Sequence, residues 1–305
     1  MDGTAALRPR PITRRNVLRG SLGLAAAGAL VVAVSACGGS PSAAGPGAGA
    51  LRPLDVQLVW LKNVQFGGSF LAQQHGYYDR LWVAPNLITG GPQVSVEPVV
   101  VQGRAPQDLL GKRIGVPSAS LAIWDTFLKA NSIDPSTITV VPVQLDPTTL
   151  VKGTVDRYLG FVTDEPIALL LKGFPTYQLK FADFGYSLYG DCYITTAAAL
   201  ANPAKRALVV GFLRAERLGW RLAAAEPLAA AAVSGPALGL DPHQQGLESQ
   251  AQAALVQPPG SGPADILTLK EPDVTANLRT LTLSGSSLSN DQLFDTSLTA
   301  DLATV

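Results

Sequence analysis

The alternation of apolar and polar positions predicts strands and helices in turn along most of the chain. Val56, Leu58 and Trp60 alternate with Gln57 and other residues, which indicates a buried strand that ends at Trp60. A helix opens near Phe66, where apolar residues one turn apart give it a buried face. A strand that leads through a loop into a helix places free backbone N–H groups at the carboxyl edge of a sheet, where open α/β folds bind ligands.

The same rhythm returns further along the chain. Strands are predicted at 94–101, 138–143, 158–162 and 179–181, and helices at 121–129, 148–152 and 203–225. Strands that alternate with helices in this way predict an α/β protein with a mainly parallel sheet. The remainder of the chain, to Val305, is expected to be α-helical.

The first 37 residues have the pattern of an export signal, with five arginines before an apolar run that ends at Ala36. That run is rather short for a membrane span, which needs about 20 residues. The stretch around Arg14-Arg15 resembles a twin-arginine signal, and Val34-Ser35-Ala36-Cys37 resembles a lipobox. We therefore expect residues 1–37 to be a lipoprotein signal peptide and 38–53 a flexible tether. An uncleaved anchor or an ordinary signal peptide is the alternative.

Composition adds mainly exclusions. The 23 basic and 23 acidic residues give a formal net charge of zero, so nothing suggests a nucleic-acid partner. The chain has two cysteines, and lipidation of Cys37 would leave Cys192 as a lone thiol, which we expect to be buried. The two histidines, His75 and His243, lie far apart without metal-ligand spacing, so neither a metal nor a cofactor is expected.

Three motifs resemble the solute-binding proteins of ABC importers. The first is Trp60-x-x-Asn63 with a helix that closes at Gly76-Tyr77-Tyr78, and the second is the Leu-x-Gly-Lys-Arg turn at 109–113 before a strand. The third is the turn Thr163-Asp164-Glu165-Pro166 after a strand. The chain is most similar to the branch that includes binders of thiamine-pyrimidine precursors, riboflavin, sulfonates and nitrate, and the resemblance covers nearly all of 54–302.

This resemblance implies a two-lobed periplasmic-binding-protein type II fold. Lobe 1 would comprise 54–104 and 189–305, and lobe 2 would comprise 105–188. In the family, several dozen residues separate the second strand from the Leu-x-Gly-Lys-Arg turn, whereas here the two pieces join at Gly103–Pro106. We therefore expect the first lobe to be incomplete.

The resemblance also implies a function. A monomer, held by its lipid on the outer face of the bacterial cytoplasmic membrane, would capture a small planar or anionic nutrient in a cleft between the lobes. It would pass that nutrient to the ABC permease of the same importer. Candidate ligands are a pyrimidine or thiamine precursor, riboflavin and a sulfonate-like compound.

Eight residues are expected to reach the cleft: Trp60, Asn63, Ser118, Ser120, Trp124, Glu165, Tyr186 and Tyr189. The rings of Trp60 and Trp124 could reach a planar ligand, and those of Tyr186 and Tyr189 could stack on it or simply cover the hinge. The serines precede a helix, where they could hold an anionic group or only cap the helix. The resemblance implies that Glu165 binds an aminopyrimidine, while a role at the helix N-terminus is the alternative.

Two other functions compete with the receptor. Some relatives of this fold are enzymes that make the thiamine pyrimidine with iron and a consumed histidine, and the two isolated histidines and the export signal argue against that activity here. The other alternative is a truncated remnant that binds nothing because its first lobe is incomplete.

Overall fold

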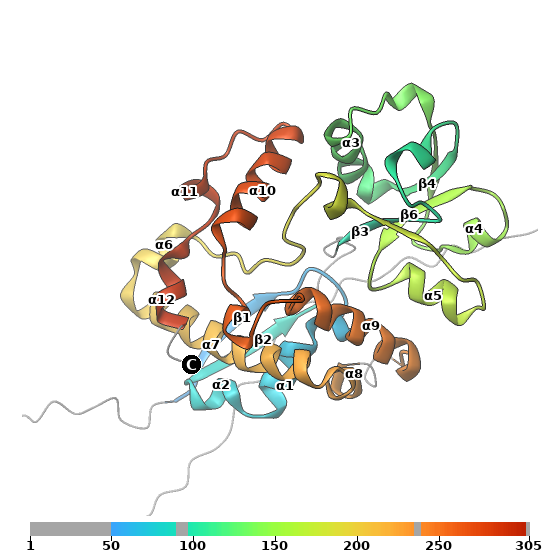
Figure 1. Ribbon diagram of the computed structural model, residues 1–305. Coiled ribbons are helices and arrows are strands. Elements are labelled where there is room, and N and C mark those ends of the chain that lie inside the picture. The colour runs from blue at the N-terminus through green and yellow to red at the C-terminus, as the bar shows by residue number, and fades with distance from the viewer. Residues whose placement is uncertain (1–49, 90–96, 235–238, 303–305) are drawn as a thin grey trace, which may run out of the picture. The chain divides into compact units, whose positions relative to one another are not determined.

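The computed structural model describes residues 50–89, 97–234 and 239–302 (Figure 1). The predicted signal peptide with Cys37, and the tether before residue 50, lie outside these ranges. The strands are β1 (Arg52–Gln57), β2 (Val83–Ile88), β3 (Pro98–Val101), β4 (Arg113–Pro117), β5 (Thr139–Val143), β6 (Arg157–Phe161) and β7 (Gln178–Lys180). The α-helices are α1 (Gly67–Gln74), α2 (Tyr77–Arg80), α3 (Leu121–Ala130), α4 (Thr148–Val151), α5 (Glu165–Leu171), α6 (Ala197–Ala201), α7 (Pro203–Ala225), α8 (Pro227–Ser234), α9 (Pro242–Val256), α10 (Glu271–Leu283), α11 (Asn290–Leu293) and α12 (Thr299–Leu302). Short 3-10 helices are η1 (Val64–Phe66), η2 (Pro106–Leu109), η3 (Ser118–Ser120), η4 (Pro135–Thr137), η5 (Phe181–Phe184), η7 (Pro263–Asp265) and η8 (Thr296–Leu298).

The larger sheet has five strands in the order β5-β4-β6-β3-β7. Strand β4 runs parallel to β5 and β6, whereas β3 is antiparallel to both β6 and β7. Apolar residues cover both of its faces. Val100 packs in the cluster that contains Trp124 of α3, whereas its neighbours Val99 and Val101 pack in the cluster that contains Leu169 of α5. Alternate residues of β3 therefore point to opposite layers, as the pleat of a strand requires.

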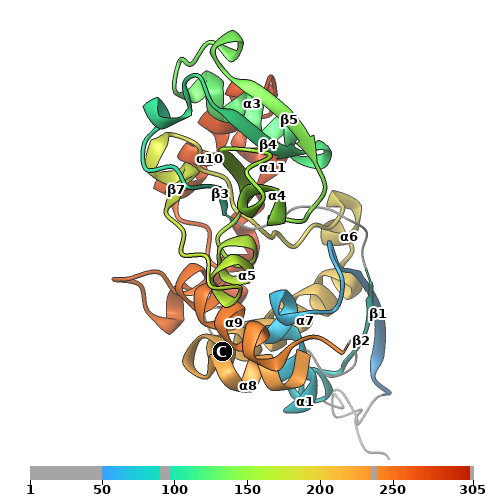
Figure 2. The same cartoon turned by 90° about the vertical axis from the view of Figure 1, so that its right-hand side faces the viewer.

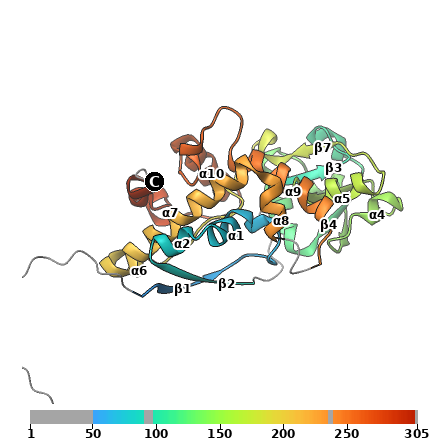
Figure 3. The same ribbon diagram turned by 90° about the horizontal axis from the view of Figure 1, so that it is seen from below.

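The smaller sheet consists of β1 and β2, which pair in parallel from Arg52↔Val83 to Gln57↔Ile88. Helices α1, α2 and α7 lie on one side of this pair (Figure 3). The core between them includes Val83 of β2, Tyr78 of α2 and Phe212 of α7. Backbone hydrogen bonds also join the two ends of this pair. The N–H of Arg52 donates to Trp82 O, and the N–H of Leu58, just after β1, donates to Ile88 O.

Helices α1 and α7 pack so closely that glycine is required on both. An added Cβ on Gly219 would lie 2.0 Å from the backbone oxygen of Gly68, and one on Gly68 would lie 2.2 Å from Cδ2 of Trp220. No side chain fits at either distance, so the two glycines set the separation of the helices.

Strand β3 and strand β2 differ from the sequence-based expectation. Strand β3, which falls within the residues 54–104 predicted for lobe 1, pairs with β6 and β7 in the five-stranded sheet. Strand β2 was not predicted, because Pro85 and Asn86 interrupt its apolar pattern. The first strand also ends at Gln57 rather than at Trp60, since its ladder with β2 stops there. The other predicted strands and helices agree with the structure to within a few residues, although residues 94–96 lie outside its described part.

Within the described residues, no helix combines the length and the apolar character that a membrane span needs.

Substitution Gly219→Ala should destabilise the protein, because the new methyl group overlaps the backbone of α1. Overpacking of this kind costs about 1–3 kcal/mol or more in free energy of unfolding. Gly262→Ala is the matched control, since a Cβ there meets nothing within 4 Å. Denaturant unfolding of both variants checks the prediction, and equal midpoints for the two would contradict it.

Candidate functional site

The turn after β1 carries the first two predicted site residues. Trp60 is half-buried and packs beside Leu58 and Phe66. Asn63 begins η1, and its Oδ1 accepts a hydrogen bond from the backbone N–H of Gln65 at 3.2 Å. Such an N-terminal cap fixes the turn, so the amide oxygen of Asn63 serves the backbone in this structure.

Helix α9 holds this turn through a stripe of buried polar side chains. Gln245, Glu248, Ser249 and Gln252 stand at positions i, i+3, i+4 and i+7, and all four are buried. Oε1 of Gln245 accepts from the N–H of Val64 at 3.1 Å, and Nε2 of Gln252 donates to the carbonyl oxygen of Gln65 at 2.8 Å. The stripe was missed from the sequence, although polar residues at the spacing of a buried helix face were its signal.

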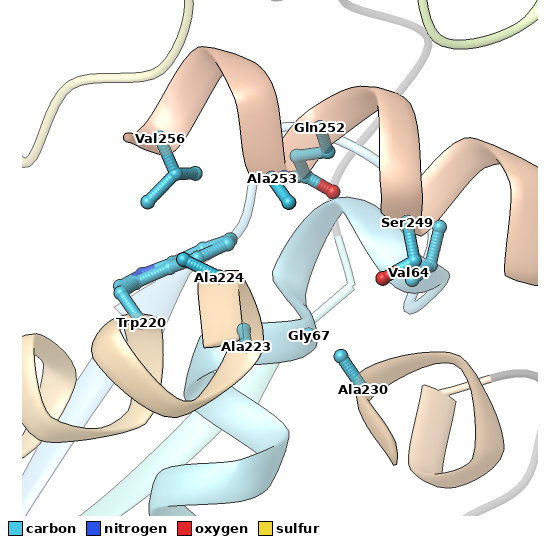
Figure 4. Close-up of a pocket in the computed structure, with 10 residues that line it drawn as sticks. All are labelled: Val64, Gly67, Trp220, Ala223, Ala224, Ala230, Ser249, Gln252, Ala253 and Val256. Carbon is cyan, nitrogen blue, oxygen red and sulfur yellow. The ribbon is translucent and has the colours of Figure 1, made fainter. Parts of the chain in front are cut away.

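A small hollow lies between this stripe and helix α7 (Figure 4). It encloses about 190 Å³, including the part open to solvent, and the indole of Trp220 forms one side. It is lined by Val64, Gly67, Trp220, Ala223, Ala224, Ala230, Ser249, Gln252, Ala253 and Val256. No charged side chain lines it, so it is poorly suited to an anionic group.

Glu165 lies at the N-terminus of α5. Helix α9 packs against α5 (Figure 2). Oε2 of Glu165 accepts from the backbone N–H of Phe161 at 2.7 Å, and only 2% of the residue is exposed. Burial, with the charge of Asp164 next, raises the pKa of Glu165 to about 8. At neutral pH this side chain therefore holds a proton, and it can donate as well as accept a hydrogen bond.

The start of α3 contains two buried polar atoms without a partner among the described residues: Oγ of Ser120 and Nε1 of Trp124. Ser120 precedes the helix but makes no side-chain cap bond, so of the two roles left open for it the cap is not observed. The two residues stand one helical turn apart and share a face. Ser118 is exposed. Burying a polar atom without a hydrogen-bond partner costs free energy, so each such atom needs an explanation.

The segment that leaves the five-stranded sheet contains Tyr186 and Tyr189. Tyr186 is buried, with its ring edge-on to Phe181 at 5.6 Å. Helix α10 binds this segment. Oδ1 of Asn277 accepts from the N–H of Tyr189 at 2.6 Å, and Oγ1 of Thr280 accepts from that of Ser187 at 3.0 Å. Both side chains on α10 are buried, and sequence reasoning missed them.

The predicted site residues thus fall into two groups. Glu165 of α5 and the 3-10 helix η1, which Asn63 caps, lie on elements that contact α9, and Trp60 packs beside Phe66 of η1. Trp124 and Tyr186 share one apolar cluster. In this structure the last two rings are core side chains rather than exposed stacking surfaces. Tyr189 is half-buried and stands edge-on to Phe294 at 6.0 Å.

A further buried carboxylate lies on α7. Glu216 is fully buried, and it accepts hydrogen bonds from Ser69 at 2.9 Å, from Tyr193 at 2.5 Å and from Tyr78. Trp220 extends the network by donating to the hydroxyl of Tyr193 at 3.0 Å. Burial raises the pKa of Glu216, and its three hydroxyl donors oppose that shift. The network ties α1, α2 and the chain after Tyr189 to α7.

Cys192 is exposed, so the expectation that it is buried is wrong. It belongs to a stretch, 190–196, in which every residue is exposed and no helix or strand forms. Across the described residues, no group of three or more His, Cys, Asp and Glu side chains is placed to hold a metal ion.

Comparison with known proteins identifies the fold. Residues 104–230 match the protein-family model described as NMT1/THI5 like. The periplasmic aliphatic sulphonate binding protein SsuA from Escherichia coli aligns with a TM-score of 0.53 and 15% identity, over 76% of this chain and 87% of that one. The alkanesulfonate-binding protein SsuA from Xanthomonas axonopodis pv. citri, bound to MOPS, aligns with a TM-score of 0.52 and 16% identity, over 83% and 99%. The Candida albicans CA3427 gene product, which exhibits the generic periplasmic binding protein fold, aligns with a TM-score of 0.52 and 16% identity, over 83% and 95%.

The chain has the periplasmic binding protein fold. The α/β class and the fold implied by the sequence motifs are therefore confirmed, and the match over 104–230 includes two of the three motifs. A search among curated proteins finds no match to the chain. The lipid on Cys37, the boundaries of the lobes and the short join at Gly103–Pro106 stay predictions.

Gln245→Ala should loosen the turn after β1, because the N–H of Val64 loses its buried acceptor and Glu248 loses a donor. An unsatisfied buried group costs about 1–3 kcal/mol in free energy of unfolding. Gln250→Ala is the control, since Gln250 lies on the same helix but is exposed. Thermal unfolding of both variants measures the difference. If Gln245→Ala and Gln250→Ala had the same melting temperature, the prediction that the stripe holds the turn would be wrong.

Proposed function

We propose that this chain is the extracytoplasmic solute-binding component of an ABC importer. Its fold supports this role, because the two SsuA proteins that share the fold are described as binding sulfonates. The predicted export signal and lipobox agree with it, since a receptor of this kind works outside the cytoplasmic membrane. The permease of the same importer is the protein partner that this role requires.

The pair of orphaned polar atoms at the start of α3 is the observation that supports a ligand here. Nε1 of Trp124 can only donate a hydrogen bond, and the hydroxyl of Ser120 can donate as well. The N-terminus of a ten-residue helix adds a partial positive charge. A solute group with acceptor oxygens fits this set of donors, so a sulfonate, a carboxylate or a planar ring with acceptor atoms is the expected class.

Glu165 and the turn at Trp60–Asn63 are the proposed second contact. A carboxyl that holds a proton near neutral pH can donate one hydrogen bond and accept another, which suits the ring nitrogens of an aminopyrimidine. We propose no direct contact with the solute for Ser118, Tyr186 and Tyr189. They belong to the segments that border the two proposed contacts.

Binding without chemical conversion is the proposed activity, and no cofactor takes part in it. Closure of the two sheet-bearing halves on the solute would follow if the solute binds the closed arrangement better than the open one. We also propose that the protein is a monomer anchored through a lipid on Cys37. Mass spectrometry that finds unmodified Cys37 in membrane-bound protein would refute the anchor.

Titration of the protein with alkanesulfonates, pyrimidine precursors and riboflavin tests the proposal, with tryptophan fluorescence and calorimetry as readouts. Ser120→Ala should weaken binding of the preferred solute by about 1.5–3 kcal/mol if the bond goes to a charged group. The same substitution should leave the unliganded protein equally stable or slightly more stable, because the hydroxyl has no partner there.

Ser284→Ala, which removes an exposed hydroxyl from the end of α10, is the control for this titration. Two results would contradict the proposal. One is the absence of binding for every class of solute, which would favour the remnant. The other is binding with unchanged affinity in Ser120→Ala, which would place the site elsewhere.

A further inference from the structure

Helix α5, which follows strand β6 of the five-stranded sheet, packs against helix α9 (Figure 2), and each of the two helices carries a buried glutamate. Glu165 opens α5 and is 2% exposed, and Glu248 stands in the middle of α9 and is 6% exposed. Burial and then the charge of Asp164 raise the pKa of Glu165, and the charge of Glu248 adds a smaller increase. A buried carboxylate is costly, and two that face one contact also repel each other.

Neutral groups and one further carboxylate surround the pair. From β6 and α5, Glu165 meets the backbone N–H of Phe161 and the charge of Asp164. From α9, Glu248 accepts from Gln244 at 2.7 Å and from Gln245 at 2.5 Å, and Asp164 also acts on it. Burial, and then the charge of Glu165, raises the pKa of Tyr158 on β6. None of the ion pairs found in the described residues includes Glu165 or Glu248.

We propose that the contact between α5 and α9 is a proton-dependent latch, which is closed while Glu165 carries a proton and loosens when both glutamates are charged. Only one proton is needed, because a single carboxylate can stay buried if hydrogen bonds satisfy it, as the two glutamines do for Glu248. The latch goes beyond solute binding and does not depend on it, since every group in it belongs to the chain.

The direction of the pH effect follows from the two titrations. Burial, followed by neighbouring charges, raises the pKa of Glu165 to about 8, and burial raises the pKa of Glu248 to about 7. When α5 and α9 separate, both carboxyl groups meet water and their pKa values return to the usual range near 4.5. The packed arrangement therefore binds protons more tightly than the separated one. The contact is therefore most stable at pH values below that usual range. Its stability is lost as the pH rises through about 7 to 8.

The latch is connected to the turn after β1. Gln245 donates to Glu248 through Nε2 and accepts from the N–H of Val64 through Oε1. A movement of α9 away from α5 therefore weakens the hydrogen bond between Gln245 and the N–H of Val64, which holds η1. Loss of a proton at the α5–α9 contact should thus reach the turn that carries Asn63.

Hydrogen exchange of the exported protein between pH 5 and pH 9 tests the latch. After correction for the intrinsic pH dependence of exchange, amides of α5, of α9 and of η1 should open at least about tenfold more often at pH 9 than at pH 5. Glu165→Gln should flatten this profile, because the amide stays neutral at every pH. Glu226→Gln, at an exposed position after α7, should keep the wild-type profile.

Two outcomes would overturn the latch. The first is a corrected exchange profile of the wild-type protein that is flat from pH 5 to pH 9. The second is a profile that stays steep in Glu165→Gln. If Glu165→Gln does not fold, Glu248→Gln replaces it, and its profile should flatten, because Glu165 then no longer meets a second buried charge across the contact. A Glu248→Gln profile identical to that of the wild type would likewise overturn the latch.

Discussion

Two segments, the turn after β1 and the chain that leaves the five-stranded sheet after β7, are held by hydrogen bonds with buried side chains of two helices. Gln245 and Gln252 of α9 satisfy the backbone of η1, and Asn277 and Thr280 of α10 satisfy the backbone around Tyr189. Backbone groups that no strand or helix pairs must find partners when they are buried. These four side chains supply such partners, and they thereby fix the segments that border the candidate site.

The half of the molecule with the two-stranded sheet relies on helices for its core. The C-terminal residues Leu298 and Leu302 are buried in the same cluster as Val83 of β2. Arginines of α7 hold that end of the chain: Arg217 donates to the carbonyl oxygen of Leu302 at 2.8 Å, and Arg206 pairs with Asp301 at 2.7 Å. Helix α7 and the C-terminal residues thus complete the core beside the two-stranded sheet.

Periodicity predicted most of the elements because the five-stranded sheet and the long helix α7 have clear apolar patterns. Asn202 and Asp241 are residue types that favour helix starts, each precedes a proline, and both accept the backbone bonds of N-terminal caps. The exceptions have local reasons. Strand β2 was not predicted, because Pro85 interrupts its apolar pattern. The partners of β3 lie far away in the sequence, so no local pattern indicates them.

The candidate site was predicted in part. Motifs pointed to Asn63, Ser120 and Glu165, and the structure gives each a distinct environment: a capped turn, an orphaned hydroxyl and a buried carboxyl. The supporting residues on α9 and α10 were missed, because polar residues such as Gln245 on a helix give no local sign that their face is buried. Only the tertiary packing shows that this face is buried.

Amide hydrogen exchange at Val64, Ser187 and Tyr189 tests most directly whether buried side chains hold these segments. All three residues lie outside regular α-helices and strands, yet each N–H donates to a side chain on α9 or α10. We predict that they exchange at rates typical of the protected helices, much more slowly than Ile194, which is 92% exposed. Exchange as fast as that of Ile194 would show that the segments are not held, and would contradict the account.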